Sequence, residues 1–316
     1  MIVTVTANPS LDRTVEVEEL RRGEVLRALS TYVHAGGKGV NVARALVAHD
    51  LPTVAVLCTG GYAGIELVAL LDDARVPLAL VPVAGGVRTN LSLVEPDGVV
   101  TKLNEPGPVL TEAELTTLLA AASDAIHTGT DWVAGCGSLP PGIPGDFYAR
   151  LVERAHARGA RAAVDSSGEA LAACLPARPD LIKPNLAELA ECAGFEVNTL
   201  ADAVKAAQIL RDRGAKAVLA SLGADGAILV YDHGSIHAEA RPSLPVASTV
   251  GAGDATLAGF LAAGGSGEKA LVDAVAWGSA AVTLPGSRMP TPNELDRAAV
   301  EVNPTIDPDR VLRERS

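Results

Sequence analysis

The stretch Ser248-Thr-Val-Gly-Ala-Gly-Asp-Ala-Thr-Leu-Ala-Gly-Phe-Leu261 places two glycines and an acid directly before a run of small and apolar residues. The run predicts a buried helix, and the glycines let several backbone N–H groups point into one small space. Because the start of a helix also carries partial positive charge, this arrangement suits a phosphate or a migrating phosphoryl group. A carboxylate beside an anion site needs a reason: Asp254 could take a proton from a hydroxyl about to be phosphorylated. The alternative is that Asp254 only caps the helix.

Outside this stretch, short β-rich runs alternate with helix-like runs through most of the 316 residues. Thr53–Cys58 followed by Ala63–Leu71 is one such pair, and Ala162–Asp165 followed by Glu169–Cys174 is another. This alternation predicts an α/β fold in which helices cover both faces of a parallel sheet. The residues after Val302 read as a solvated tail.

Two segments break the alternation, residues 12–34 and residues 87–103. The first holds alternating patterns at Thr14–Glu18 and Val25–Val33, and the second reads as a hairpin around Pro96-Asp-Gly98. We expect the two segments to pair into a small sheet beside the main body. Such a sheet over the carboxyl ends of parallel strands would act as a lid.

Composition and charge disfavour several classes of function. Hydrophobic residues make up 48% of the chain, the formal net charge is −12, and the sequence contains no cluster of Lys and Arg. These values disfavour a nucleic-acid partner. No uncharged run reaches the roughly 18 residues that span a bilayer, and the chain opens on a strand, so we expect no membrane partner and a cytoplasmic location. The four cysteines show no metal-binding spacing and predict free thiols in a reducing compartment.

A second glycine cluster, Ala35-Gly-Gly-Lys-Gly-Val-Asn-Val-Ala-Arg-Ala-Leu46, also opens a helix. It is neither a P-loop nor a GxGxxG fingerprint, because the spacing and the residue after Lys38 are wrong for both. Lys38 offers a point charge and Asn41 a donor–acceptor pair on the first helical turn, which favours ligand binding. A plain tight turn is the alternative for Gly36 and Gly37.

Polar residues near the predicted lid could meet the same ligand. Asp12 follows the first strand and could accept hydrogen bonds from sugar hydroxyls. Arg88 and Asn90 alternate along the lid hairpin, so they share one face, and Lys102 lies on the returning strand. An ordinary solvated surface explains each of these residues equally well in isolation.

Further motifs follow predicted strands, where ligands bind in parallel sheets. Gly137-Ser-Leu-Pro-Pro-Gly142 is one, and Ser221-Leu-Gly-Ala-Asp-Gly226 is a glycine turn that suits nucleotide phosphates or a plain β-turn. After Lys183, Asn185 and Glu188 lie one helical turn apart and could hold Mg²⁺ through its waters. Asn185 could instead be only the N-cap of a helix.

In this order, these motifs resemble the ribokinase/PfkB family of carbohydrate kinases over about residues 1–290. The resemblance implies a ribokinase-like fold, mainly a parallel sheet sandwiched by helices, with a small β-sheet lid. It divides the chain into a core (residues 1–11, 35–86 and 104–302), a lid (12–34 and 87–103) and a tail (303–316). It also implies ATP and Mg²⁺ as cofactors, and a homodimer formed through the lid, with Arg27 reaching a phosphate pocket across that interface.

The resemblance assigns roles residue by residue. Asp254 corresponds to the catalytic base, and Gly251, Ala252 and Gly253 to the anion hole. The sugar-phosphate contacts are Asp12, Gly36, Gly37, Lys38, Asn41, Arg88, Asn90, Lys102 and Ser138. The nucleotide contacts are Lys183, Asn185, Ser221, Gly223, Gly226, Thr249 and Ser279, with Glu188 as a Mg²⁺ ligand through water.

Within the family, Asn8-Pro9…Asp12, Asn104-Glu-Pro-Gly107 and Gly137–Gly142 look most like the 1-phosphofructokinase and tagatose-6-phosphate kinase branch. The expected partners are therefore a phosphorylated ketohexose and ATP, and the expected reaction converts fructose 1-phosphate to fructose 1,6-bisphosphate. Tagatose 6-phosphate or fructose 6-phosphate is the alternative substrate. A non-catalytic sugar-phosphate sensor and a dehydrogenase are the alternatives of other classes; the first is disfavoured by the intact Gly-Ala-Gly-Asp, the second by the missing dinucleotide fingerprint.

Two positions depart from the family pattern. Asp50 stands where Gly or Ser is expected after the first helix, which bears on how that helix is capped. Trp277-Gly-Ser279 stands where relatives often place an Asn near the adenine, which bears on nucleotide preference.

Overall fold

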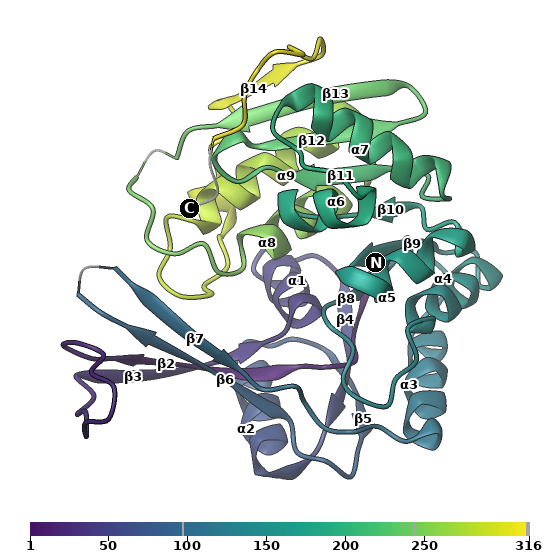
Figure 1. The fold of residues 1–316 in the computed structure, drawn as a ribbon. Coiled ribbons are helices and arrows are strands. Elements are labelled where there is room, and N and C mark those ends of the chain that lie inside the picture. Colours follow the sequence, from purple (N-terminus) through teal and green to yellow (C-terminus); the bar gives the residue numbers. More distant parts are fainter. Residues whose placement is uncertain (97, 243, 314–316) are drawn as a thin grey trace.

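The computed structural model of the protein describes residues 1–96, 98–242 and 244–313, which form an α/β body and a smaller sheet beside it (Figure 1). The body is built on a ten-stranded sheet in the order β14-β13-β12-β11-β10-β9-β8-β1-β4-β5. All pairs from β11 to β5 are parallel, and β12, β13 and β14 add an antiparallel edge. Its strands are Ile2–Thr6 (β1), Thr53–Thr59 (β4), Leu78–Pro82 (β5), Trp132–Cys136 (β8), Arg161–Asp165 (β9), Leu181–Ile182 (β10), Val218–Ser221 (β11), Ala227–Tyr231 (β12), Gly234–Ala240 (β13) and Val300–Asn303 (β14).

Helices cover both faces of this sheet because its central strands carry apolar side chains on both sides. In β8, Val133 packs into the core beneath α3 to α7, whereas its neighbour Trp132 packs into the core beneath α1, α8 and α9. A third cluster lies between α1, α2 and β4. The helices are Lys38–Val47 (α1), Gly61–Asp73 (α2), Glu112–Asp124 (α3), Phe147–Ala157 (α4), Gly168–Cys174 (α5), Leu186–Ala193 (α6), Leu200–Asp212 (α7), Ala252–Ala262 (α8) and Gly267–Ala281 (α9), with 3-10 turns at Leu175–Ala177, Gly223–Asp225 and Pro292–Glu294. The predicted α/β fold is confirmed.

The smaller sheet, called the lid below, has the strand order β3-β2-β6-β7. Its strands are Ser10–Glu16 (β2), Ser30–Gly36 (β3), Arg88–Val94 (β6) and Val100–Asn104 (β7). The two distant segments meet where β2 pairs with β6 in parallel, while β3 and β7 pair antiparallel at the edges. The turn of the predicted 87–103 hairpin includes residue 97, which lies outside the described residues.

One predicted lid strand is too long. The alternating pattern Val25–Val33 predicts a strand from residue 25, but β3 begins at Ser30 and residues 17–29 form no strand. The register explains this, because Ser30 pairs with Glu16 at the end of β2, so earlier residues have no partner strand. Arg27 lies exposed in this connection.

The end of the chain also differs from the prediction of a solvated tail. Val302 and Asn303 belong to β14, which pairs with β13. Beyond it, Leu312 is buried in the core and Arg310 and Arg313 form ion pairs with the body. Arg310 and Arg313 are therefore paired with specific residues of the body and are not simply solvated charges.

Three smaller sequence inferences concern a helix end, the thiols and the membrane. After α1, Asp50 adopts a left-handed conformation (φ 54°), which explains why this position favours glycine. The four cysteines are free, as predicted, and only Cys192 is half-exposed. Among the described residues, no helix has both the length and the apolar character needed to cross a membrane.

Candidate functional site

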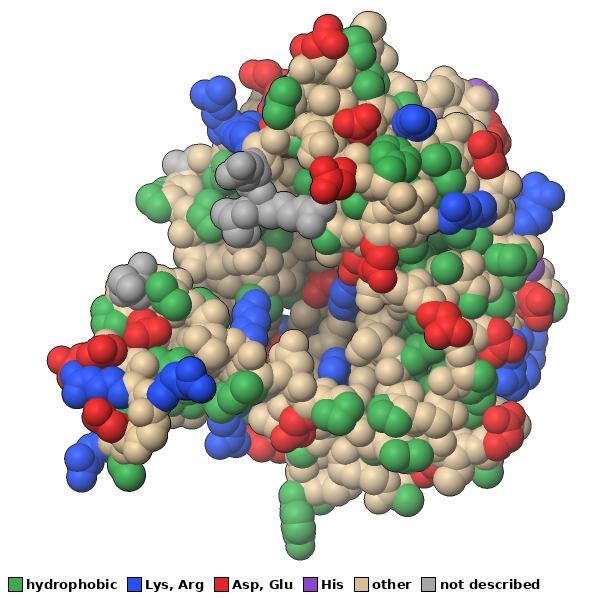
Figure 2. Space-filling model, in the orientation of Figure 1, with side chains coloured by type: hydrophobic (Ala, Val, Ile, Leu, Met, Phe, Trp, Pro, Cys, Tyr) green, Lys and Arg blue, Asp and Glu red, His purple; other side chains and the backbone are tan. Residues whose placement is uncertain are grey.

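The predicted site residues gather at the carboxyl ends of the parallel strands, as expected for an α/β sheet. Asp165 ends β9, Lys183 follows β10 and Ser221 ends β11, while Asp12 lies on β2 just after β1. The start of α8 faces the same edge. Figure 2 shows that the molecule is hollowed between the lid and the body, and that acidic and basic side chains are visible inside the hollow.

Asp254 lies in the first turn of α8, directly after Gly251, whose positive φ of 81° starts the helix. Its side chain is buried, and Asn41 Nδ2 donates a hydrogen bond of 2.9 Å to its Oδ2. Burial first, and the nearby charge of Asp165 second, raise the pKa of Asp254 to about 6, against the lowering effect of Asn41 and two lysines. Among the described residues, no side-chain capping hydrogen bond is found at the start of α8. A carboxyl with these properties can exchange a proton near neutral pH.

Asn41 is held in one orientation by a residue that the sequence analysis missed. Arg44 Nη1 donates to Asn41 Oδ1 at 3.0 Å and to the Ala35 carbonyl at 3.2 Å. With its oxygen engaged, the amide presents its nitrogen to Asp254. This contact could have been predicted from the sequence, because Arg44 lies three residues after Asn41 and therefore on the same face of α1.

Close contacts with neighbouring residues explain why the two positions before α1 are glycines. Gly37 has a φ of 110°, and a Cβ there would lie 3.1 Å from the Thr6 side chain. A Cβ at Gly36 would lie within 2.5 Å of the Asp12 carboxylate. Both positions therefore allow the chain to pass close to neighbouring groups.

A buried carboxylate, Asp165, joins two lysines beneath the site. Its Oδ1 lies 2.8 Å from Lys38 Nζ and its Oδ2 lies 3.0 Å from Lys183 Nζ. Burial raises the pKa of Asp165, but the Lys183 and Lys38 charges outweigh it and hold the pKa below its usual value. Asp165 was not among the residues predicted from the sequence, although an acid that closes a buried strand at this edge of the sheet was a usable signal.

Asn185 and Glu188 are engaged with each other. Asn185 Oδ1 accepts a hydrogen bond from the Glu188 backbone at 2.9 Å, and Glu188 Oε2 accepts one from the Asn185 backbone at 2.9 Å. This capping box starts α6 and matches the alternative of a helix cap for Asn185. The other Glu188 oxygen, Oε1, lies 3.3 Å from Lys38 Nζ, so Glu188 faces the site.

The predicted sugar side is built where β2 pairs with β6. Asp12 and Asn90 are direct partners in this pairing, and Asn90 Nδ2 donates to Asp12 Oδ1 at 2.9 Å. Arg88 Nη1 donates to the Glu105 carbonyl at 3.0 Å. Arg88 Nε and Asn90 Oδ1 are buried without a hydrogen-bond partner among the described residues.

Two other predicted contacts are less well placed. Ser138 Oγ receives a 3.4 Å hydrogen bond from Asn8 Nδ2 after β8. Lys102 is exposed on β7, where it pairs with Ser92, two residues along β6 from Asn90. By strand alternation, Lys102 therefore shares a face with Asn90 but lies further out on the lid.

The residues predicted to bind the nucleotide lie around the turn Leu222–Gly226, which is called the nucleotide turn below. Ser221 precedes it and bridges to Asn185, which joins this turn to the start of α6. Gly223 is exposed, whereas a Cβ at Gly226 would lie 2.1 Å from the Ala238 carbonyl oxygen of β13. The turn thus has an open side and a packed side.

The remaining predicted residues lie on other elements. Thr249 is exposed in the loop before α8, and Ser279 is half-buried on α9. No described hydrogen bond joins either residue to the nucleotide turn. Ala252 is the first residue of α8, and a Cβ at Gly253 would lie 3.3 Å from Lys183 Nζ.

The site combines a buried carboxyl that can accept a proton with a helix start that suits an anion. Two lysines and the lid lie beside them. These features together define a phosphotransferase that acts on a hydroxyl.

The comparisons with known proteins name the family. Residues 5–294 match the profile described as pfkB family carbohydrate kinase. The chain is 42% identical to 1-phosphofructokinase of Rhodobacter capsulatus over 82% of each chain, and 37% identical to ATP-dependent 6-phosphofructokinase isozyme 2 of Escherichia coli over 91% of this chain and 94% of that one. It resembles the crystal structure of phosphofructokinase-2 from Escherichia coli in complex with substrates and products, with a TM-score of 0.86, 35% identity, and coverage of 93% and 96% of the two chains.

The chain therefore belongs to the pfkB family of carbohydrate kinases, and it is an ATP-dependent sugar-phosphate kinase. Kinases of this family use ATP and a divalent metal.

Proposed function

We propose that the protein is a 1-phosphofructokinase, which transfers the γ-phosphoryl group of ATP to fructose 1-phosphate and forms fructose 1,6-bisphosphate. The observation that carries the catalytic part of the proposal is Asp254, a buried carboxyl with a pKa of about 6 at the start of α8, held by Asn41. The choice of fructose 1-phosphate is supported by the 42% identity to 1-phosphofructokinase of Rhodobacter capsulatus. A non-catalytic sensor has no use for a proton acceptor at this place. In the proposal, Asp254 takes the proton of the acceptor hydroxyl while the hydroxyl oxygen attacks the γ-phosphorus, and the bond from the γ-phosphorus to the bridging oxygen breaks so that ADP leaves.

The backbone N–H groups of Gly251, Ala252 and Gly253 would receive the charge of the transferring group. They lie at the N-terminus of α8, where the helix dipole favours an anion. Lys183 supports this placement, because its ammonium lies beside Gly253. The lid would exclude water and so limit hydrolysis of ATP.

We assign the acceptor pocket to Asp12, Asn90 and Arg88 on the lid, with Lys38 and Asn41 at the start of α1. The support is chemical, since Asp12 can accept from sugar hydroxyls and Arg88 can pair with an existing phosphate. The unpartnered atoms Arg88 Nε and Asn90 Oδ1 are two groups that a sugar phosphate would satisfy.

We propose Mg²⁺ as the divalent metal, held by Glu188 through water together with phosphate oxygens of the nucleotide. Among the described residues, no group of three or more His, Cys, Asp or Glu could hold a metal by itself. That fits Mg²⁺, which usually takes one or two carboxylates, several waters and substrate phosphates. When bound, it would neutralise charge on the phosphates. Lys183, Asn185, Ser221, Gly223, Gly226, Thr249 and Ser279 are the proposed nucleotide contacts.

A coupled assay of ADP release across sugars tests the function. We expect kcat/KM for fructose 1-phosphate to exceed that for fructose 6-phosphate and tagatose 6-phosphate by about tenfold or more, since one misplaced charged hydrogen bond costs about 1.5–3 kcal/mol. A preference for fructose 6-phosphate would instead select the alternative that the Escherichia coli relative represents. Comparable turnover of free fructose contradicts a phosphorylated acceptor, and no turnover with any sugar supports the sensor.

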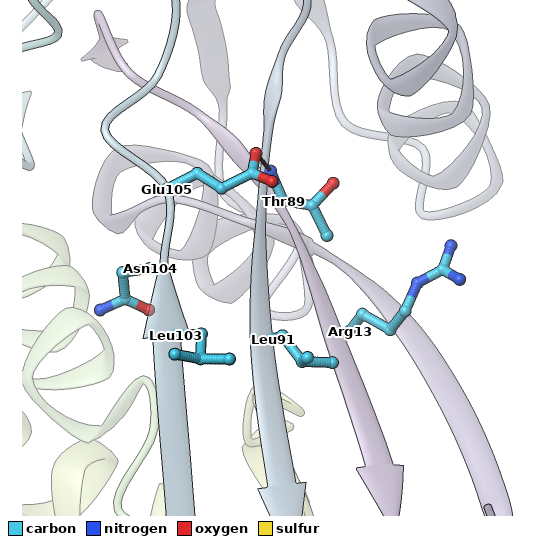
Figure 3. A pocket seen from close by; sticks show the side chains of 6 residues that line it. All are labelled: Arg13, Thr89, Leu91, Leu103, Asn104 and Glu105. Carbon is cyan, nitrogen blue, oxygen red and sulfur yellow. Dashed lines mark hydrogen bonds between the residues drawn. The ribbon is translucent and has the colours of Figure 1, made fainter. Parts of the chain in front are cut away.

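We further propose that two copies pair through the face of the lid opposite to Asp12 and Asn90. Arg13, Leu91 and Leu103 lie opposite one another on β2, β6 and β7, and strand alternation puts them on that face. Figure 3 shows these residues lining a shallow hollow with Thr89, Asn104 and Glu105. Leu103 is 58% exposed and lies opposite the half-buried Leu91, so this face presents adjoining apolar side chains that a second copy could cover.

Replacing Leu103 with Lys is therefore expected to shift the protein from dimer to monomer in sedimentation equilibrium, because a charge would enter an apolar contact. Tyr62→Lys is the matched control: Tyr62 is 93% exposed on α2, outside the lid, and its replacement should leave the dimer intact. A dimer that survives Leu103→Lys, or a wild-type monomer, contradicts pairing through this face.

A further inference from the structure

The nucleotide turn contains a buried carboxylate that no step of the proposed reaction uses. Asp225 is buried, whereas its neighbours Gly223 and Ala224 in the same 3-10 turn are exposed. A buried carboxylate is stable only when charges or hydrogen bonds compensate it. Whatever compensates Asp225 therefore also determines the position of the exposed residues beside it.

The compensating groups come from the end of the chain. The Arg313 backbone N–H donates to Asp225 Oδ2 at 2.7 Å, and Arg313 Nε donates to Oδ1 at 2.9 Å. Arg310 Nη2 donates to Asp225 Oδ1 at 3.3 Å. Arg310 Nη1 and Nη2 also donate to the two carboxylate oxygens of Glu239 on β13, at 2.6 Å each. Burial raises the pKa of Asp225, but the hydrogen bonds from Arg313 and Arg310 lower it below its ordinary value.

The segment that supplies these arginines, called the C-terminal latch (residues 310–313), is itself anchored. Leu312 is buried in the core, and its N–H donates to the Asn198 carbonyl at 2.9 Å. Leu200 N–H donates to the Arg310 carbonyl at 3.0 Å. Figure 1 shows the chain turning back from β14 toward the body. The latch thus ties the start of α7 and β13 to the nucleotide turn.

The other side of the turn is already fixed. The Leu222 N–H donates to the Gly226 carbonyl at 2.8 Å, and Gly226 packs against Ala238. His237, which is also buried, contacts the Asp225 carbonyl at 2.7 Å. The remaining freedom of the turn lies in residues 223–225, which would have to rotate outward to bring an uncompensated Asp225 carboxylate to water.

We propose that the C-terminal latch holds the nucleotide turn in the conformation that binds ATP, so that Arg310 and Arg313 are positioning residues for the nucleotide. The inference rests on the proposed function, which assigns nucleotide binding to this turn. It gives the end of the chain a role in the ATP site, although neither arginine touches the reacting atoms.

Calorimetric titration with a non-hydrolysable ATP analogue tests the proposal. The double variant Arg310→Ala/Arg313→Ala should bind the analogue about 5- to 20-fold more weakly than wild type, within the usual range of coupling between linked sites. In steady-state kinetics, KM for ATP should rise by a similar factor, while KM for the sugar phosphate and kcat at saturating ATP change by less than about twofold. Arg150→Ala is the matched control, because Arg150 pairs with Glu112 on the surface, 3.8 Å away.

Two further variants separate positioning from a loss of folding. Arg313→Ala leaves the Arg310–Glu239 pair intact and should show part of the same loss of ATP affinity. Asp225→Asn, added to the double variant, removes the buried charge and should recover part of that affinity. Unchanged analogue affinity in the double variant overturns the proposal, as does an equal loss in both KM values and kcat. A wild-type protein that binds no analogue overturns the proposed function, and the role of the latch with it.

Discussion

Asp254→Asn is expected to lower kcat by about 10²- to 10⁴-fold, the range that a positioned general base contributes. Asparagine has nearly the same shape and can keep a hydrogen bond with Asn41, but it cannot take the proton of the acceptor hydroxyl. The change should therefore fall on kcat, with KM for ATP within about threefold of wild type, since uniform binding is untouched. Steady-state ADP release with saturating sugar phosphate measures it.

The stability of the same variant is the control. The pKa of Asp254 is raised in the folded protein, to about 6 from 3.8, so ionisation of the carboxyl opposes folding. Well below the unfolded pKa of 3.8 the group is protonated in both states and there is no penalty; the penalty grows as the pH rises and is complete well above the folded pKa of about 6. Asp254→Asn should thus raise Tm at pH 7.5 or leave it unchanged. A kcat within tenfold of wild type in a folded variant contradicts the role of base.

Much of the fold was predictable because its signals are local. The alternation of β-rich and helix-like runs reports the parallel sheet, since each strand and each helix carries its own periodicity. The glycines at positions 36, 37, 251 and 253 report where the backbone must approach a neighbour. Polar residues after strands predict a shared edge of the sheet, and the family resemblance assigned Asp12 to one site with Lys38, Asn41 and Asp254, which lie at glycine-rich helix starts.

The rest depends on partners distant in sequence. The sequence marks Asp165 as an acid that ends a buried strand, but only the fold brings two lysines to it. Likewise, Arg310 and Arg313 read as solvated charges until the chain end returns to Asp225. Residues 25–29 have a strand-like pattern but no strand to pair with, because β2 ends at Glu16. A local residue pattern does not reveal which ion-pair partner or neighbouring strand the fold will supply.

Asp165→Asn should have the largest effect on stability of the changes considered for this site. Asp165 is fully buried and Lys183 is 3% exposed, so removing the carboxylate leaves an ammonium uncompensated in the interior. Breaking a buried pair in this way costs about 3–5 kcal/mol. Urea unfolding at pH 7.5 should therefore give a free energy of unfolding lower by about that amount. Asp131→Asn is the matched control: Asp131 is 63% exposed where it pairs with the N-terminal amine, and its replacement should change the value by less than about 0.5 kcal/mol.

The same variant links Asp165 to the proposed base through pH. The wild-type kcat/KM should fall about tenfold per pH unit below pH 6, because Asp254 must be ionised to accept a proton. The charge of Asp165 helps to raise that pKa, and the lysines that remain in Asp165→Asn lower it. The acid limb of the profile should therefore move to lower pH in Asp165→Asn and stay in place in Asp131→Asn. An acid limb that does not move, or that moves to higher pH, would mean that Asp254 is not the titrating base or that Asp165 does not act on its charge.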